Sequence, residues 1–237
     1  MRLLAIETAT SVASVAVVDD SGVLAEAVLR SPMRHLEWLL PVAGQLLEQL
    51  DLEPAAIQGL AVSRGPGGFT GLRIGIATAA GWAKAGRVPL VGVDTLEALA
   101  CVPGVPGLIL PVLDAHRGEV AGALYRLERA GRPVCLLPPL VASPEAFAAE
   151  VAAHTGPLLL VGDALARYGA RLRAALGDRA RAAAADVHPR AAAVGVLALP
   201  RLSRGERVDP DTLAPVYGRR PVVWPRQETP GRGGNPP

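Results

Sequence analysis

The chain opens with three runs of apolar residues that polar, turn-forming residues separate. The runs cover residues 3–6, 12–18 and 23–29, and the segments between them are rich in threonine, serine, aspartate and glycine. Apolar runs of this length with such boundaries are typical of strands joined by tight turns. The pattern therefore predicts three consecutive antiparallel strands.

Two longer segments have the spacing of helices. Apolar residues recur every three or four positions over residues 35–50, which predicts a helix that Pro41 would bend. A second helix is expected from about residue 70 to residue 85, with Thr70 as its N-cap. A glycine-rich turn comes directly before it, so this helix would begin at a sharp change of chain direction.

Short apolar runs separate these helices and follow them. Residues 57–63 and 90–93 are predicted strands, and a short helix is expected near residues 96–100. The order is then three strands, helix, strand, helix, strand, helix. This order is typical of a ribonuclease-H-like half, in which sequential strands pair and helices carry the crossovers.

A second copy of this order begins after the proline-rich segment 102–106. The first apolar run of each half ends in an acid, Glu7 in one half and Asp114 in the other. We therefore expect an α/β fold of two ribonuclease-H-like lobes, as in actin and the sugar kinases. Fewer strand and helix patterns follow the three-strand opening of the second half, so we expect a complete N-terminal lobe and a reduced C-terminal lobe. The elements predicted for the second half are strands over 108–113, 120–127, 134–141 and 158–161 and helices over 164–176 and 190–204.

The expected domain limits are residues 1–102, residues 103–217 and a disordered tail over residues 218–237 that is rich in proline, glycine and arginine. The tail holds four arginines and one glutamate, a net charge of +3, while the whole chain of 237 residues carries only +2. The rest of the chain is therefore close to neutral and is not expected to attract RNA by its bulk charge. Three Trp, three Tyr and two Phe are also too few to predict a stacking surface.

Other composition features narrow the class of protein. No apolar run reaches the length of about 18 residues that a membrane span needs, and Glu7 interrupts the only candidate leader. Cys101 and Cys135 stand far apart and outside any metal or redox spacing, and the four histidines are scattered. We expect a protein of the reducing cytoplasm without a metal site and without a membrane contact.

Two kinds of loop could hold a phosphate. The glycine-rich segment 65–71 follows a strand and opens a helix, but it lacks the lysine of a Walker loop and the third glycine of a dinucleotide loop. Segments 7–11 and 114–118 stand where actin-like folds hold ATP, although Ala9 occupies the position of close backbone approach. Tight turns explain these loops equally well, so both interpretations stay open. The residues concerned are Glu7, Thr8, Thr10, Gly65, Gly67, Gly68 and Asp114.

The second predicted helix carries a stripe of small residues. Gly71, Gly75 and Ala79 are spaced four apart, beside the larger Leu72 and Trp82. Such a stripe lets another element approach closely, and some close contact must offset the roughly 1 kcal/mol that each glycine costs a helix relative to alanine. The approaching element is either the chain's own sheet or a partner's helix, and the sequence alone leaves both open.

Taken together, these residues resemble the TsaB (YeaZ) family. The resemblance covers about residues 1–217 and is most specific over residues 65–75. It implies a noncatalytic subunit that binds and activates the related transferase TsaD, which attaches threonylcarbamoyl to the tRNA adenosine beside the anticodon, helped by the ATPase TsaE. Further matches lie at residues 4–10, at His35 with residues 39–41, at residues 89–96, at Asp114 with Glu119, and at residues 210–217.

Two positions test this implication. TsaD-like chains carry two histidine metal ligands just after the strand that corresponds to residues 90–93, whereas this chain has Thr95 and Leu99 there, neither of which offers an imidazole. The resemblance therefore implies an inactive paralogue without a cofactor of its own. ATP and metal are expected on the partner subunits, and the TsaE-like ATPase and tRNA are expected to reach this chain only through the complex.

The two N-terminal helices are the expected contact with TsaD, and with a second copy of this chain when TsaD is absent. The competing hypotheses are an active ATP-dependent small-molecule kinase of the same fold, a peptidase and a self-sufficient structural homodimer. The expected interface residues are His35, Leu36, Leu39, Thr70, Gly71, Leu72, Arg73, Ile74, Gly75, Ala79 and Trp82.

Overall fold

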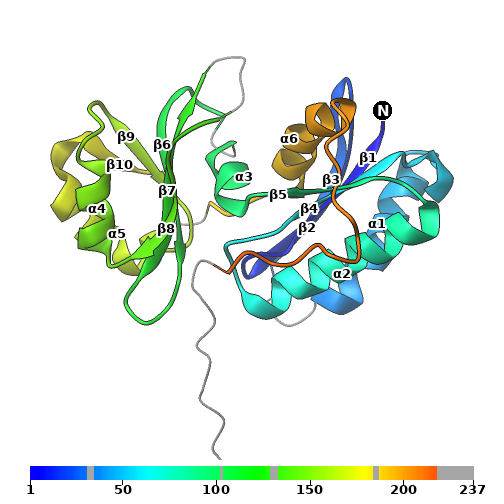
Figure 1. Cartoon of the computed structure of the whole chain (residues 1–237), viewed down its shortest axis with the longest axis horizontal. Helices are drawn as coiled ribbons and strands as arrows, with labels where there is room; N and C mark the ends of the chain where they lie inside the picture. Colours follow the sequence, from blue (N-terminus) through cyan, green and yellow to red (C-terminus); the bar gives the residue numbers. More distant parts are fainter. Residues whose placement is uncertain (31–34, 102–103, 129–132, 184–186, 218–237) are drawn as a thin grey trace, which may run out of the picture.

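The computed structural model describes residues 1–30, 35–101, 104–128, 133–183 and 187–217, which form two lobes side by side (Figure 1). The predicted tail, residues 218–237, lies outside the described residues. Across the ranges that the structure describes, no helix is long and apolar enough to cross a membrane. Each lobe is built around one five-stranded sheet.

The first sheet has the strand order β3-β2-β1-β4-β5. β1, β2 and β3 form an antiparallel meander, and β4 and β5 continue the sheet in parallel from β1. The three-strand opening and the two later strands are therefore confirmed. The strands are β1 (Leu3–Glu7), β2 (Val12–Asp19), β3 (Gly22–Arg30), β4 (Gly59–Ser63) and β5 (Leu90–Val93).

Helices cover both faces of this sheet, which is why β1 is buried along its whole length. Leu4 and Ile6 point to the face covered by α1 (His35–Gln49) and α2 (Phe69–Gly86). Leu3 and Ala5, on the alternate positions, point to the face covered by α6 (Ala191–Ser203). α2 is capped by Gly68 without a side-chain hydrogen bond, so the expectation that Thr70 is its N-cap is wrong.

The second sheet repeats the first. Its order, β10-β9-β6-β7-β8, has the same antiparallel meander and the same two parallel strands. The copy thus keeps all five strands, although β10 is only three residues long. The sequence analysis missed β10 and α4. The strands are β6 (Gly107–Asp114), β7 (Val120–Leu127), β8 (Val134–Ala142), β9 (Leu158–Val161) and β10 (Ala180–Ala182), and the helices on them are α4 (Pro144–Val151) and α5 (Leu165–Leu176).

The last helix of each half packs against the other lobe. Leu96 and Leu99 of α3 (Thr95–Cys101) lie in the core beside β6 and β7, whereas α6 packs on the first sheet (Figure 1). An ion pair of Glu97 with Arg201, at 2.5 Å and largely buried, joins α3 to α6. This exchange corrects the expected domain limits, because α6 lies within residues 103–217 yet belongs to the first lobe in space.

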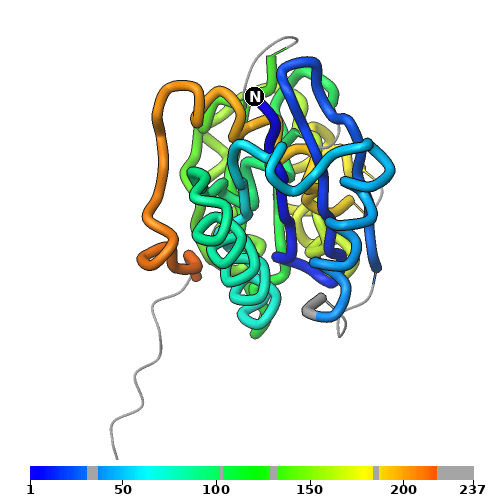
Figure 2. The backbone as a smooth tube through the Cα atoms, turned by 90° about the vertical axis from the view of Figure 1, so that its right-hand side faces the viewer, coloured from blue at the N-terminus to red at the C-terminus, as the bar shows by residue number. Residues whose placement is uncertain are grey.

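A strap over residues 204–217 returns along the first lobe and passes α2 (Figure 2). Val208 pairs with Leu90 at the edge of β5, and Asp211 forms an ion pair with Lys84 of α2. The backbone N–H of Val216 then donates to the carbonyl of Arg64 at 2.6 Å. The strap therefore ends at the glycine-rich turn before α2. Two short 3-10 helices, η1 (Pro54–Ala56) and η2 (Gly177–Arg179), complete the described elements.

Candidate docking face and interlobe cleft

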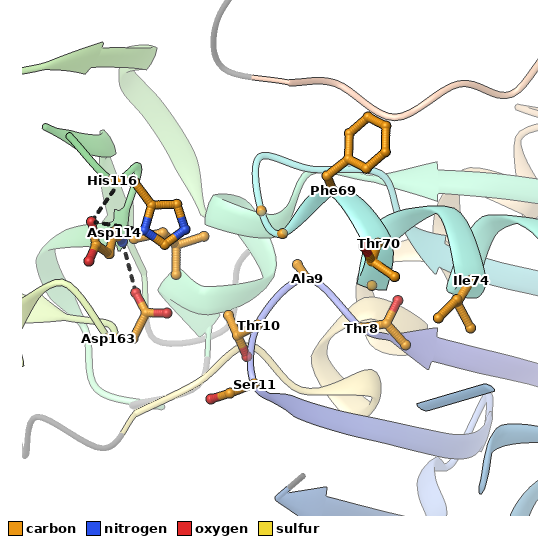
Figure 3. A pocket seen from close by; sticks show the side chains of 14 residues that line it. Thr8, Ala9, Thr10, Ser11, Phe69, Thr70, Ile74, Asp114, His116 and Asp163 are labelled. Atoms are coloured by element: carbon orange, nitrogen blue, oxygen red, sulfur yellow. Dashed lines mark hydrogen bonds and ion pairs between the residues drawn. The ribbon is translucent and has the colours of Figure 1, made fainter. Parts of the chain in front are cut away.

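A cleft of about 560 Å³ lies between the lobes. Residues of the β1–β2 turn and of the start of α2 line one wall, and Asp114, His116 and Asp163 line the other (Figure 3). The structure thus brings together most of the residues that the sequence analysis named as possible phosphate loops. What each loop does there follows from its contacts.

The glycine-rich turn is pressed against the β1–β2 turn. The N–H of Gly68 donates to the carbonyl of Ala9 at 2.7 Å, and a Cβ placed on Gly67 would lie 2.6 Å from both the Cβ and the carbonyl oxygen of Ala9. Gly65, with φ +115°, would bring a Cβ within 2.2 Å of the carbonyl oxygen of Val216 in the strap. These glycines are therefore required for close backbone contacts within the chain. This favours the structural interpretation of the loop over a phosphate cradle.

Glu7 ends β1 beneath the same turn and is completely buried. Its Oε1 accepts a hydrogen bond from the N–H of Ala9 at 2.5 Å, while Oε2 has no hydrogen-bond partner among the described residues. Burial raises the pKa of Glu7 from 4.5 to about 7, and the Ala9 hydrogen bond offsets part of that effect. The carboxyl is therefore largely uncharged below neutral pH, and it does not line the cleft.

On the second lobe, the carboxylate groups organise the turn after β6. Asp114 Oδ1 accepts from the N–H of His116 at 2.7 Å, and Oδ2 lies 3.7 Å from the guanidinium of Arg167. Asp163 Oδ1 accepts from the N–H of Asp114 at 2.9 Å, and burial raises the pKa of Asp163. These contacts hold the turn in shape, which is the role that sequence reasoning offered as the alternative to phosphate binding.

Thr95 and Leu99 also have structural roles. The hydroxyl of Thr95 accepts from the N–H of Gly65 at 3.1 Å, and the side chain of Leu99 is fully buried beside the second sheet. Among the described residues, no group of three His, Cys, Asp or Glu side chains is arranged to hold a metal ion. Thr95 and Leu99, the two positions for which the resemblance implied lost metal ligands, are thus residues of the core.

The small-residue stripe faces the chain's own sheet. A Cβ on Gly75 would lie 2.2 Å from Thr8 Oγ1, and Ala79 and Leu72 are fully buried. Leu39 of α1 is buried in the same core. The expectation that these four residues meet a partner is therefore wrong, because they are already buried within the chain.

The face of α2 that points away from the sheet carries a different stripe. Ala77, Gly81 and Ala85 are exposed and spaced four apart. With Trp82 of α2, Leu40 of α1, which is 54% exposed, and Pro54 and Ala55 of η1, they line an apolar groove of about 620 Å³. A Cβ on Gly81 would meet no other atom of the described residues within 4 Å. This groove is an exposed apolar surface available to a partner.

Comparisons with known proteins agree with this architecture. The family model for TsaD, described as tRNA N6-adenosine threonylcarbamoyltransferase, matches residues 16–136. The tRNA threonylcarbamoyladenosine biosynthesis protein TsaB of Escherichia coli is 32% identical over 98% of this chain and 100% of its own length. The chain belongs to the TsaB (YeaZ) family.

Two solved structures share the fold of this TsaB-family chain. YeaZ from Pseudomonas aeruginosa superposes with a TM-score of 0.80 at 29% identity, covering 91% of this chain and 99% of that chain. The ethanolamine utilization protein EutJ from Carboxydothermus hydrogenoformans, with a TM-score of 0.51 at 13% identity, covers 83% of this chain and 89% of its own and shares the fold alone. The two-lobed α/β architecture predicted from the sequence is confirmed.

The remaining predicted interface residues of the TsaB-family chain have separate locations. Trp82 lines the groove, whereas Thr70, Gly71 and Ile74 line the interlobe cleft. The guanidinium of Arg73 lies 3.9 Å from the centroid of the Phe69 ring, and its Nε donates to the Tyr217 hydroxyl at 3.1 Å. His35 and Leu36 form the first turn of α1, and their side chains lie outside the described part. Sequence reasoning missed Ala77, Gly81 and Ala85, although their four-residue spacing was a usable signal.

Proposed function

We propose that this chain is a noncatalytic subunit that binds a TsaD-like transferase through the groove between α1 and α2, and that it supports threonylcarbamoylation of tRNA by that enzyme. The observation that carries the proposal is the exposed apolar groove with its stripe of small residues. An apolar surface of this kind on an otherwise well-packed lobe is typical of a protein contact. Its site of action would be the cytoplasm.

The expected shape of the partner follows from the sequence similarity between this chain and the TsaD family. The TsaD family model matches residues 16–136, a range that includes α1 and α2, so a TsaD-like partner has helices that correspond to these. Two related lobes can pair through the same faces about a twofold-like axis. Ala77, Gly81 and Ala85 would let the partner's helix approach closely, with Leu40 and Trp82 as larger anchors on either side.

The same reasoning covers the chain without its partner. A second copy presents the same groove, so we expect a homodimer paired through this face when TsaD is absent. The TsaE-like ATPase would join through the complex. Binding can shift TsaD toward its active conformation only by as much as this chain prefers that conformation.

A noncatalytic role is supported by the residues at the positions of chemistry. Thr95 and Leu99 stand in place of two histidines and are held in the core. The glycine-rich turn is packed against the β1–β2 turn at Ala9, which gives its glycines a structural role. Both features are expected of a paralogue that keeps the fold and its binding surface without the catalytic groups.

The test is a substitution in the groove. Gly81→Arg places a charged side chain in the contact while the lobe has room for it, so we expect a melting temperature that is not lowered. We expect at least a hundredfold loss of affinity for the TsaD-like subunit, corresponding to about 3 kcal/mol. Ala170→Arg, on the exposed face of α5, is the matched control and should bind normally. Titration calorimetry measures both. Wild-type affinity for Gly81→Arg would contradict the proposal.

A further inference from the structure

The two helices beside the groove each carry a line of exposed residues with a charge at both ends. On α1 the positions are spaced three or four apart, which places them on one side of the helix. The sequence of α1 contains no lysine or arginine, and the charges at both ends of its line are carboxylates. This acidic line consists of Glu37, Leu40, Gly44 and Glu48, all of which are exposed.

α2 presents a matching line of the opposite sign. The sequence of α2 contains no aspartate or glutamate, and the residues of its basic line are again spaced three or four apart. In each line the two charges are eleven residues apart, which corresponds to about three helical turns and about 16 Å. The basic line therefore has the length and the sign that the acidic line requires of a partner. It consists of Arg73, Ala77, Gly81 and Lys84, all of which are exposed.

The charges of the two lines lie on opposite sides of the groove. α1 packs over β2 and β3, and Glu37 lines a small pocket together with Leu29 of β3. α2 packs over β4 and β5, and Lys84 forms its ion pair with Asp211 of the strap at that end of the sheet. The face formed by α1 and α2 is therefore polarised, with negative charge toward β3 and positive charge toward the strap.

The contacts of the basic line within the chain leave it able to meet a carboxylate. Arg73 contacts the ring of Phe69 and the hydroxyl of Tyr217, which are both uncharged groups. In the pair of Lys84 with Asp211, the side chains are 51% and 68% exposed. An ion pair as exposed as this one stabilises a fold little, so Lys84 can also pair with a carboxylate of a partner.

α1 and α2 run in the same general direction. β3 is antiparallel to β2 and β2 is antiparallel to β1, so β3 runs parallel to β1, as do β4 and β5. Each helix returns from the end of one of these strands to the start of the next, so both helices run opposite to the strands. Glu37 and Arg73 are therefore near one end of the face, and Glu48 and Lys84 are near the other.

Two copies of the chain can join through this face about a twofold axis in two ways. With the axis along the helices, α1 of one copy lies on α2 of the other, and the two helices run in the same direction. With the axis across the helices, α1 lies on α1 and α2 lies on α2, so that like charges meet. Opposite charges meet only in the first arrangement.

We propose that this chain forms a homodimer in which α1 of each copy packs against α2 of the other, with Glu37 facing the partner's Arg73 and Glu48 facing the partner's Lys84. The inference rests on the proposed function for the use of the groove, and it deepens that function by naming the residues that fix the arrangement. The apolar groove supplies most of the affinity, and the charges select this arrangement over the other one.

The experiment is a double charge reversal in the full chain, without any other subunit. Sedimentation equilibrium at a series of protein concentrations measures the dimer dissociation constant of the wild type, Glu48→Lys, Lys84→Glu and the double variant. Each single reversal brings like charges together at two symmetric contacts, so we expect dimerisation to be at least about tenfold weaker. The double variant exchanges the two signs and should return to within about threefold of the wild type. Glu150→Lys, an exposed reversal on α4 of the other lobe, is the control and should change little.

Loss of the strap contact cannot imitate this result. Lys84→Glu and the double variant both lose the pair with Asp211, so recovery in the double variant reports the contact between the two exchanged positions. Single reversals that leave the dimer unchanged would overturn the proposal, because in the other arrangement like charges meet before and after each reversal.

A double variant whose loss of affinity equals the sum of the two single losses would also overturn it. So would a wild-type chain that stays monomeric at every concentration. Titration of Gly81→Arg with the TsaD-like subunit tests the proposed function separately, because that measurement requires no homodimer.

Discussion

The buried carboxyl of Glu7 allows a sharp test of how the β1–β2 turn is built. The substitution Glu7→Gln keeps the size of the side chain and an oxygen that can accept from the N–H of Ala9. It removes the ability to ionise. If the turn is a packed structural element, the neutral side chain should suit it at least as well as the acid.

The magnitude follows from the shifted pKa of Glu7, which burial raises from 4.5 to about 7. Between these two pH values the folded chain holds a proton that the unfolded chain has released, so its stability falls as the pH rises through this window. The full difference is about 3 kcal/mol and is reached above about pH 7. Glu7→Gln should therefore match the wild type within about 1 kcal/mol near pH 4.5 and exceed it by up to about 3 kcal/mol near pH 8.

Urea denaturation followed by circular dichroism, at a series of pH values, measures the difference in unfolding free energy between the two proteins. Glu48→Gln, an exposed glutamate on α1, is the control and should show no trend of this size. A difference between wild type and Glu7→Gln that stays constant with pH would refute the reasoning. A variant that is less stable than the wild type near pH 8 would do the same.

Two further predictions concern contacts that stabilise the fold, one inside the first lobe and one between α3 and α6. Gly75→Ala should lower the unfolding free energy by about 1–3 kcal/mol, because its Cβ would lie 2.2 Å from Thr8 Oγ1. In the same urea titration, the control Gly44→Ala should raise it by about 0.5–1 kcal/mol, because the new Cβ meets no described atom within 4 Å. Equal effects of the two substitutions would place the stripe of small residues away from the sheet. Arg201→Ala leaves the buried Glu97 without its ion-pair partner and should lower the unfolding free energy by about 3 kcal/mol, while loss of the exposed pair in Arg171→Ala should change it by less than about 1 kcal/mol. A small effect of Arg201→Ala in calorimetric melting would show that this pair does not join the lobes.

The regular elements could be predicted because their patterns are local. The three-strand opening and β4, β5 and β9 have apolar runs bounded by turn residues, and α1 has clear helical spacing. α4 and β10 were missed because their local patterns are weak: α4 is short and alanine-rich, and β10 spans only three residues. A pattern that spans a few residues cannot be told from a loop without its tertiary contacts.

The candidate site depended on contacts between distant residues, which local patterns do not contain. The spacing of Gly75 and Ala79 correctly indicated a close approach, but only the position of Thr8 shows that the neighbour is the chain's own sheet. Similarly, Phe69 and Tyr217 are far apart in sequence and meet because the strap returns along α2. The exchange of α3 and α6 between the lobes is a tertiary feature of the same kind.

The central claim is that this chain acts by binding its partner through the groove. The most direct measurement is the amount of threonylcarbamoylated tRNA formed by the TsaD-like and TsaE-like proteins with wild-type chain, with Gly81→Arg, with Ala170→Arg and without any chain. We expect full product with the wild type and Ala170→Arg, and only background product with Gly81→Arg or without the chain. Full product in the absence of the chain, or equal product with Gly81→Arg, would contradict the claim.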